Sequence, residues 1–210
     1  MSSRNYTDFK NNTYRVKSKS STTLISVTDM KLYLRIDTST EDLLIEMLIK
    51  SAVDVAEKLM NRSILETVWT NLRSDIEQDL TLRRAEFLAL NSIEYMKDGS
   101  YVALDSDNYQ IATGGIYAKV WEIELADSCD AHPEAIKIEF KTGYGASASS
   151  VPESIITAIK QHVAYMFENR GDCFEFSDGT DSILNAEKLL PITCALVYKM
   201  HRVVDVNGVI

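Results

Sequence analysis

The segment around Gly143 and Gly145 is the part of the sequence that comes closest to a site for chemistry. A β-like run, IKIEFKT, leads into the two glycines, and a helix is predicted to begin at Pro152. A phosphate-binding loop has the same order of elements, because the free amides of a helix N-terminus bind anions. The spacing matches neither GxGxxG nor GxxxxGK[ST], and Pro152 lacks one of the amides that would face a phosphate. The sequence therefore favours a plain strand-to-helix turn over a nucleotide site.

The other residue types that catalyse reactions are scattered along the chain. His132, His162 and His201 fall on three different predicted elements, and none has a Cys, His or carboxylate at zinc-ligand spacing. We expect His162 to lie in a helix core or interface. Asp54 and Glu57 fall on a predicted exposed face, where nothing shifts a carboxyl pKa for acid or base catalysis. The sequence predicts that this protein is no enzyme and has no catalytic, cofactor-binding or metal residues.

The composition indicates an ordinary soluble protein. The 210 residues are 45% hydrophobic and 25% charged, and no apolar run approaches the roughly 18 residues that a membrane span needs. The first residues lack the apolar centre of a secretion signal, and Cys129, Cys173 and Cys194 are odd in number and widely spaced. We expect a protein made in the cytoplasm, without membrane contact, with reduced and mostly buried thiols.

Charge is distributed unevenly between the N-terminus and the rest of the chain. Residues 1–23 carry five basic residues against Asp8 alone, a net charge of +4, which leaves −13 for the remainder of a chain whose total is −9. An acidic body disfavours binding of DNA phosphates. Residues 1–23, rich in Ser, Thr and Asn, predict a basic flexible arm that becomes ordered on meeting a partner, such as a neighbouring subunit or an acidic surface. A solvated tail without a role is the alternative.

Two helices are predicted to follow the arm. Ser26 and Asp29 resemble a capping box that opens a short helix over 27–34. Apolar residues spaced three and four apart predict a long helix over 41–60, ended by a left-handed residue at Asn61. The predicted buried stripe of the long helix is Leu44, Met47, Leu48, Ala52, Val55, Ala56 and Leu59.

Short β-like runs separated by turns fill the middle of the chain. Asp98-Gly99 predicts a tight hairpin turn, and Thr113-Gly114-Gly115 predicts a second one. Pro152 and Pro191 each open a further helix. The predicted fold class is α+β: a helical bundle built from both chain ends with an inserted antiparallel β-rich subdomain. The predicted boundaries are 1–23 for the arm, 24–66 for the first helices, 67–145 for the β-rich subdomain, 146–204 for the last helices and 205–210 for a C-terminal tail.

Three stretches of about residues 24–204, taken in order, resemble the head-tail connector (adaptor) proteins of tailed bacteriophages, which bind beneath the portal. The first is a short helix ending in Leu-Arg, a polar loop, a long helix, an Arg and a strand with Trp. The second is a Gly-Tyr-Gly loop with a Pro-opened helix that closes in Glu-Asn-Arg, and the third is the last helix. The positions that carry the resemblance include Leu34, Arg35, Arg62, Trp69, Gly143, Tyr144, Gly145, Pro152, Arg170 and Arg202. The arm and residues 172–190 are longer than this family leads us to expect.

The resemblance implies a structural virion protein in the neck at the portal vertex, assembled in the host cytoplasm. It implies a ring of about twelve copies that bridges capsid and tail and lines the DNA exit channel. The implied partners are the portal protein, neighbouring copies, and a tail or tail-completion protein. Genomic DNA would pass through without specific binding, which suits an acidic body.

The apolar C-terminus is the segment that we expect to dock on the portal. An apolar, extended tail suits addition to the edge of a partner's sheet. The predicted docking residues are Val203, Val204, Val206, Val209 and Ile210. The alternative is a tail that folds back on its own helices.

Two other functions stay open at the level of sequence. One is a different tail-completion or neck protein of the virion, which would bind a tail component rather than the portal. The other is a small hydrolase with a β-rich substrate domain. The hydrolase requires some of His162, Glu168, Asp172 and His201 to converge in one pocket.

Overall fold

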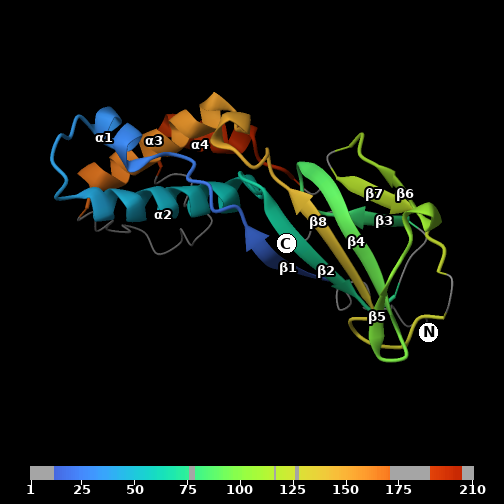
Figure 1. Ribbon diagram of the computed structural model, residues 1–210. Helices are drawn as coiled ribbons and strands as arrows, with labels where there is room; N and C mark the ends of the chain where they lie inside the picture. The colour runs from blue at the N-terminus through green and yellow to red at the C-terminus, as the bar shows by residue number, and fades with distance from the viewer. Residues whose placement is uncertain (1–11, 76–78, 116, 126–127, 171–189, 205–210) are drawn as a thin grey trace, which may run out of the picture. The chain divides into compact units, whose positions relative to one another are not determined.

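The computed structural model describes residues 12–75, 79–115, 117–125, 128–170 and 190–204. The chain divides into two compact units (Figure 1). The sheet unit comprises residues 1–21 and 65–146, and the helical unit comprises residues 22–64 and 147–210. The predicted mixture of helices with antiparallel sheets is confirmed.

The sheet unit contains two antiparallel sheets. The large sheet has the strand order β1-β2-β8-β4-β5, and the small sheet has the order β3-β7-β6. The strands of the large sheet are β1 (Asn12–Lys19), β2 (Thr67–Arg73), β8 (Ile136–Thr142), β4 (Phe87–Lys97) and β5 (Ser100–Ala103). Those of the small sheet are β3 (Asp79–Leu82), β7 (Ala118–Trp121) and β6 (Gln110–Ala112). The described 3₁₀ turns are Ser106–Asn108, between β5 and β6, and Ala148–Ser150, which follows β8 and belongs to the helical unit.

The hairpin between β4 and β5 forms where Asp98-Gly99 predicts it. Asp98 has φ 52° and Gly99 has φ 76°, and Lys97 pairs with Ser100 across the turn. Two successive left-handed residues give a turn whose twist matches that of the flanking strands. The second predicted hairpin, around residues 113–115, joins β6 to β7.

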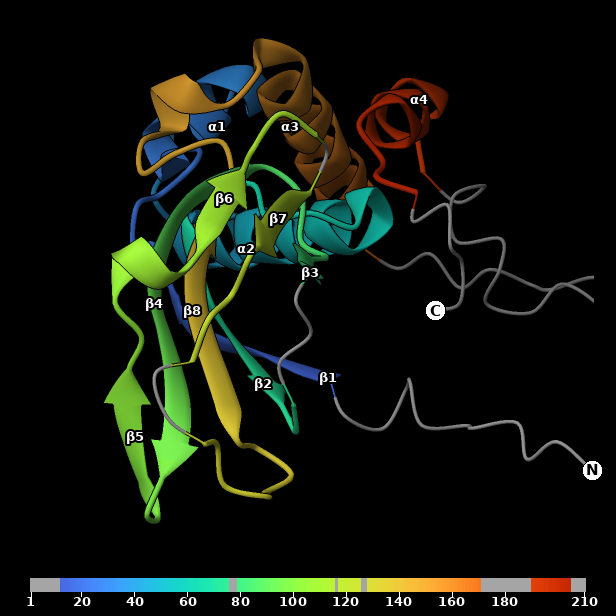
Figure 2. The ribbon, with the colours of Figure 1, turned by 90° about the vertical axis from the view of Figure 1, so that its right-hand side faces the viewer.

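The two faces of β8 explain how the sheet unit is layered. Ile136, Ile138 and Phe140 are fully buried and pack with residues of the small sheet such as Leu80 and Val120. Figure 2 shows the small sheet in front of β4 and β8. The side chains between them, at 137, 139 and 141, point to the opposite face, because strand residues alternate. That face is a ladder of ion pairs, formed by Lys137 with Glu94 (2.7 Å), Lys17 with Glu139 (2.6 Å) and Lys141 with Glu66 (2.9 Å).

Residues 12–19 correct the prediction of a flexible arm over 1–23. They form β1, an edge strand that pairs antiparallel with β2. The guanidinium of Arg84 lies over the rings of both Tyr14 and Trp69, 4.7 and 4.6 Å from their centroids, and so binds β1 to the unit. Charged side chains are common on edge strands, where they discourage pairing with other chains. Because the same composition is typical of a solvated arm, the sequence of residues 12–19 does not distinguish the two. Residues 1–11 lie outside the described part.

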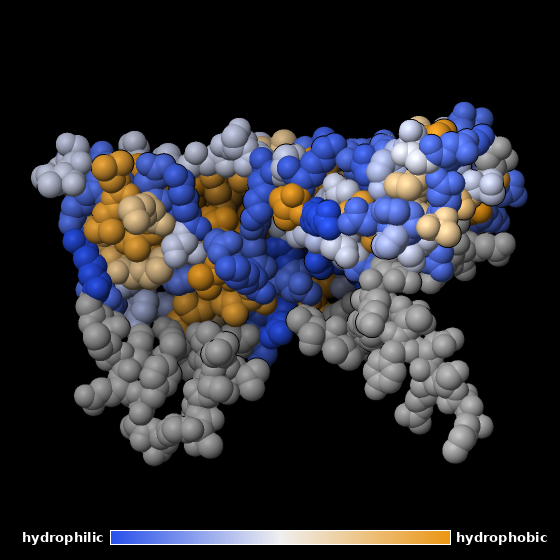
Figure 3. Space-filling view, turned by 90° about the horizontal axis from the view of Figure 1, so that it is seen from below, coloured by the Kyte–Doolittle hydropathy of each residue, from blue (hydrophilic) through white to orange (hydrophobic). Residues whose placement is uncertain are grey.

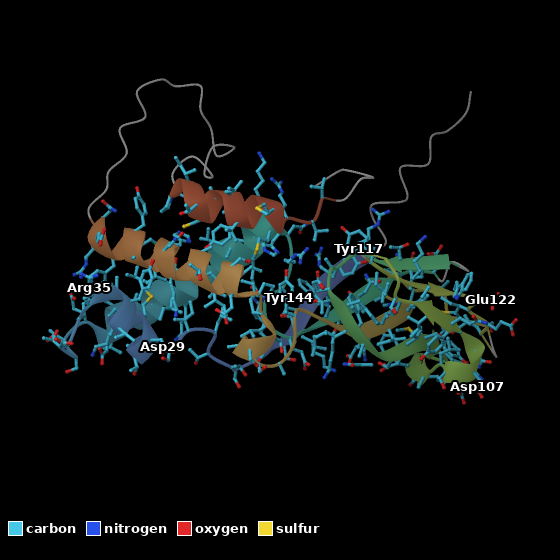
Figure 4. All side chains as sticks on the ribbon, turned by 90° about the horizontal axis from the view of Figure 1, so that it is seen from above. Asp29, Arg35, Asp107, Tyr117, Glu122 and Tyr144 are labelled. Carbon is cyan, nitrogen blue, oxygen red and sulfur yellow. The ribbon has the colours of Figure 1, made fainter. Side chains whose placement is uncertain are left out.

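The helical unit contains α1 (Val27–Leu34), α2 (Asp42–Met60), α3 (Glu153–Glu168) and α4 (Ile192–Met200). The predicted capping of α1 is confirmed, because the Ser26 hydroxyl accepts a hydrogen bond from the Asp29 amide (3.0 Å). Arg35 (φ 59°) and Asn61 (φ 52°) end α1 and α2 in the left-handed conformation, as predicted for Asn61. Asp29 and Arg35 are labelled in Figure 4. Pro152 is the residue before α3 rather than its first helical residue.

The buried stripe of α2 differs from the predicted one. Met47, predicted to be buried, is 67% exposed, whereas Ile45 and Met60 are fully buried. The observed stripe is Ile45, Ile49, Ala52, Ala56 and Met60. The start of the helix, LLIEMLI, is apolar on nearly every side, so that two registers fit the period equally well. Packing against the other helices decides between them.

The free cysteines that the structure describes are half-buried Cys129 and buried Cys194, and burial raises the pKa of the Cys194 thiol. Cys173 lies outside the described residues. Within the described part of the chain, no helix is long and apolar enough to cross a membrane.

Candidate assembly surfaces

His162 and Tyr198 form a buried polar contact between α3 and α4. The Tyr198 hydroxyl lies 3.4 Å from His162 Nδ1, and the two rings meet edge to face. Burial lowers the pKa of His162 and raises the pKa of Tyr198, so both groups are held neutral. His162 therefore belongs to the core between these helices, as predicted from its place on the apolar side of α3.

The residues that a hydrolase would need do not converge where the structure describes them. His201 Nε2 lies 3.2 Å from the Ser154 hydroxyl, near the start of α3. His162 is eight residues further along that helix, which is about 12 Å at 1.5 Å per residue. Glu168 is exposed at the far end of α3, and Asp172 lies outside the described residues. No cluster of three potential metal ligands occurs in the described ranges either.

The Gly-Tyr-Gly loop is a backbone clamp within the sheet unit. Gly143 has φ +119°, and its amide donates to the Glu86 carbonyl (2.8 Å). The Gly145 carbonyl accepts from the Glu66 amide (2.8 Å). A Cβ on Gly143 would lie 2.5 Å from the Leu65 carbonyl oxygen, so only glycine fits this close approach. The loop thus joins the end of β8 to the segment before β2, while Tyr144 between the glycines is half-buried (Figure 4).

Two further motif residues, Trp69 and Arg170, make contacts within the folded chain. The Trp69 indole donates to the Thr142 hydroxyl (3.1 Å) beside that loop. Arg170 at the end of α3 forms an ion pair with Glu41 before α2 (2.6 Å) and lies over the Phe167 ring. Of the other motif residues, Leu34 and Arg62 are half-buried, whereas Arg35 and Arg202 are exposed.

Val203 corrects part of the predicted docking segment. Its amide donates to the Met60 carbonyl (2.9 Å), its carbonyl accepts from the Asn61 side chain (3.3 Å), and it is only 4% exposed. The chain therefore folds back on the end of α2 at this residue, which is the alternative that the sequence left open. Val204 is 66% exposed. Val206, Val209 and Ile210 lie outside the described residues.

Two exposed apolar surfaces on the helical unit are absent from the sequence-based predictions. We call Ile192, Leu196 and Met200 the α4 stripe, and they are 86%, 56% and 75% exposed. We call Leu43 and Met47 the α2 patch, and they are 78% and 67% exposed. The view from below in Figure 3 shows hydrophobic residues on the surface at the end of the helical unit where α2 begins. The sequence feature that could have indicated these surfaces is an excess of apolar residues on both sides of each helix.

Comparison with solved structures shows which fold the chain shares. A chain of the structure "Neck of empty GTA particle computed with C6 symmetry" superposes with a TM-score of 0.70 at 15% identity, covering 92% of this chain and 97% of that one. "Virion of native gene transfer agent (GTA) particle" gives 0.70 at 15% identity, covering 92% and 96%. "Neck of native GTA particle computed with C12 symmetry" gives 0.67 at 14% identity, covering 92% and 97%. At such low identities the likeness shows the fold alone.

Comparison of sequences identifies the family. No curated protein matches the sequence. The family model described as head completion protein (HCP) matches residues 23–204, a range that includes the four described helices and every described strand after β1. The family resemblance that the sequence motifs predict is thereby confirmed, and the chain belongs to the head completion protein family.

Proposed function

We propose that this protein is a structural head-tail connector in the neck of a tailed-phage virion, where it joins the capsid to the tail. The observation that carries the proposal is the match of the head completion family over residues 23–204. The fold shared with chains of gene-transfer-agent necks supports the same location. The function is one of assembly and not of catalysis, in keeping with the scattered positions of His162 and His201.

The helices from the two chain ends form the bundle that gives a subunit its rigid part. The ends meet where Val203 hydrogen-bonds to Met60 and Asn61, and where Arg170 pairs with Glu41. A ring subunit needs such a part, because each copy must present fixed surfaces to two neighbours. Neck structures of similar chains are computed with C6 and C12 symmetry, which supports a ring of about twelve copies here.

The C-terminal residues 204–210 remain the proposed portal-docking segment. Val203 anchors the chain at the end of α2, and Val204 is the first exposed residue beyond the anchor. The net charge of −9 suits a ring through which DNA passes without being bound, since like charges do not capture phosphates. A tail or tail-completion protein is the proposed partner on the other side.

A pair of infections tests the location. In a host infected with a phage that encodes this protein but cannot make tails, we expect purified DNA-filled heads to carry the chain, detected by mass spectrometry. In an infection that lacks this gene, we expect filled heads and separate tails in electron micrographs, with joining restored by the wild-type gene on a plasmid. Finding the chain on free tails and not on tail-less heads would contradict the proposal and indicate a tail-completion protein.

A further inference from the structure

The edge of β2 that faces β1 is a site that an extended segment must fill. Asn71 of β2 is fully buried, and its side-chain amide donates to the Asn12 side chain and to the Thr13 carbonyl of β1 (3.3 Å). Without β1, this buried amide would lose both partners, which lowers stability. Every folded copy of the chain therefore needs a strand on this edge.

The side chains of β1 define the kind of segment that the β2 edge accepts. Tyr14 packs on the hydrophobic core of the sheet unit. On the opposite face of the strand, Arg15 pairs with Glu134 (2.9 Å) and Lys17 pairs with Glu139 (2.6 Å). The edge therefore accepts an extended segment with an inward aromatic residue and outward basic residues. Residues 12–19, NTYRVKSK, carry this pattern.

A short hinge joins β1 to the rest of the chain. The residues that follow, 22–64, belong to the helical unit and contain α1 and α2, so β1 and β2 are far apart in sequence. A single crossing near residue 21 connects the strand to that unit. The crossing residues Ser21, Thr22 and Thr23 are exposed and lie in neither a helix nor a strand. A short hinge beside a terminal element favours exchange of that element between identical chains.

We propose that in the assembled ring β1 of each copy occupies the β2 edge of the next copy. The contacts of β1 with the sheet are the same after the exchange, because strand and edge are identical in every copy. A ring favours the exchange, since it holds neighbouring copies at a high effective concentration. Each copy gives one strand and receives one, which is a head-to-tail relation that can close into a ring. This inference rests on the proposed function, because the connector ring brings the copies together.

Single cysteines on the two paired strands test the exchange. Arg15 of β1 lies directly opposite Thr70 of β2. Full-length Arg15→Cys and Thr70→Cys chains are mixed, bound to portal rings, isolated with the portal and oxidised. Non-reducing gels and peptide mass spectrometry then detect a disulfide between position 15 of one chain and position 70 of another. We expect this disulfide on the portal at roughly ten times its level in the same mixture free in solution.

Two controls accompany the mixture, and circular dichroism melting checks that each variant is folded. The double variant Arg15→Cys/Thr70→Cys, oxidised as a dilute free chain, should form the disulfide within one chain. Val102→Cys, on the opposite edge of the large sheet, replaces Arg15→Cys in the second control and should form no disulfide with position 70.

Two results would overturn the exchange without touching the connector function. One is a portal-bound mixture that forms no disulfide between chains, although the double variant forms it within one chain. The other is an equal yield from the Val102→Cys mixture, which would indicate random oxidation. A chain that fails to bind portal rings at all would contradict the connector function together with the exchange, so the two failures are distinguishable.

Discussion

At the scale of single residues, Gly143 occupies a backbone position in the sheet unit that only glycine fits. Its φ of +119° lies in a region that side-chain-bearing residues rarely adopt, and the Leu65 carbonyl occupies the place of a Cβ. We predict that Gly143→Ala lowers the free energy of unfolding by about 1–3 kcal/mol from the backbone conformation alone, and by more through the clash. Urea unfolding followed by circular dichroism measures the loss.

Gly114→Ala is the matched control for that substitution. A Cβ at Gly114 meets nothing within 4 Å, so this change should alter stability by less than about 0.5 kcal/mol. Equal stability of Gly143→Ala and wild type would show that the loop relaxes freely and is no clamp.

The burial of His162 makes the stability of the helical unit depend on pH. Burial lowers its pKa in the folded chain below the ordinary 6.5, so the unfolded chain binds a proton first as the pH falls. Stability is therefore fully present above about pH 6.5 and decreases below it, by at most about 1.4 kcal/mol per pH unit for one group. We predict that wild type loses more stability between pH 7.5 and 5 than His162→Asn, in urea unfolding at each pH. Parallel losses in both proteins would contradict a buried neutral histidine.

At the scale of elements, α2 has two apolar sides with different roles. Ile45 is fully buried among the helices, whereas Met47, two residues on, faces solvent. We predict that Ile45→Asp unfolds the helical unit or lowers its stability by several kcal/mol, because an unpaired buried charge is costly. Met47→Asp should keep the wild-type melting temperature. A stable Ile45→Asp protein, measured by thermal melting, would show that the stripe is assigned to the wrong register.

Local signals explain why some elements could be predicted from the sequence. The Ser26 cap, the left-handed Asn61 and the Asp98-Gly99 turn each depend on residues within a few positions of one another, so the sequence contains the whole interaction. The alternation of apolar and charged residues in IKIEFKT likewise indicates which side chains lie on each face of β8.

Elements that depend on distant partners could not be predicted in the same way. The strand β1 is held by Arg84 and Glu139, which lie far along the chain. Val203 is buried at the end of α2, where its amide donates to the carbonyl of Met60, more than 140 residues earlier in the chain. The choice between Ile45 and Met47 as the buried side of α2 depends on packing against the other helices of the unit. Each outcome is set by tertiary packing that no local pattern records.

At the scale of the whole molecule, the family match and the open apolar surfaces point to a part of a larger assembly. The described helices leave several large apolar side chains open to solvent, among them Ile192 and Leu43. The segment after Val203 would be available to bind the portal.

The most direct test of the connector function is the mass of the complex formed with the portal protein of the same genome. Light scattering should show portal rings gaining the mass of about twelve chains, and the gain should be lost when residues 204–210 are removed. Binding by the truncated chain would place the docking site elsewhere while leaving the connector function intact. No gain in mass with the full-length chain at any salt concentration would contradict the connector function itself.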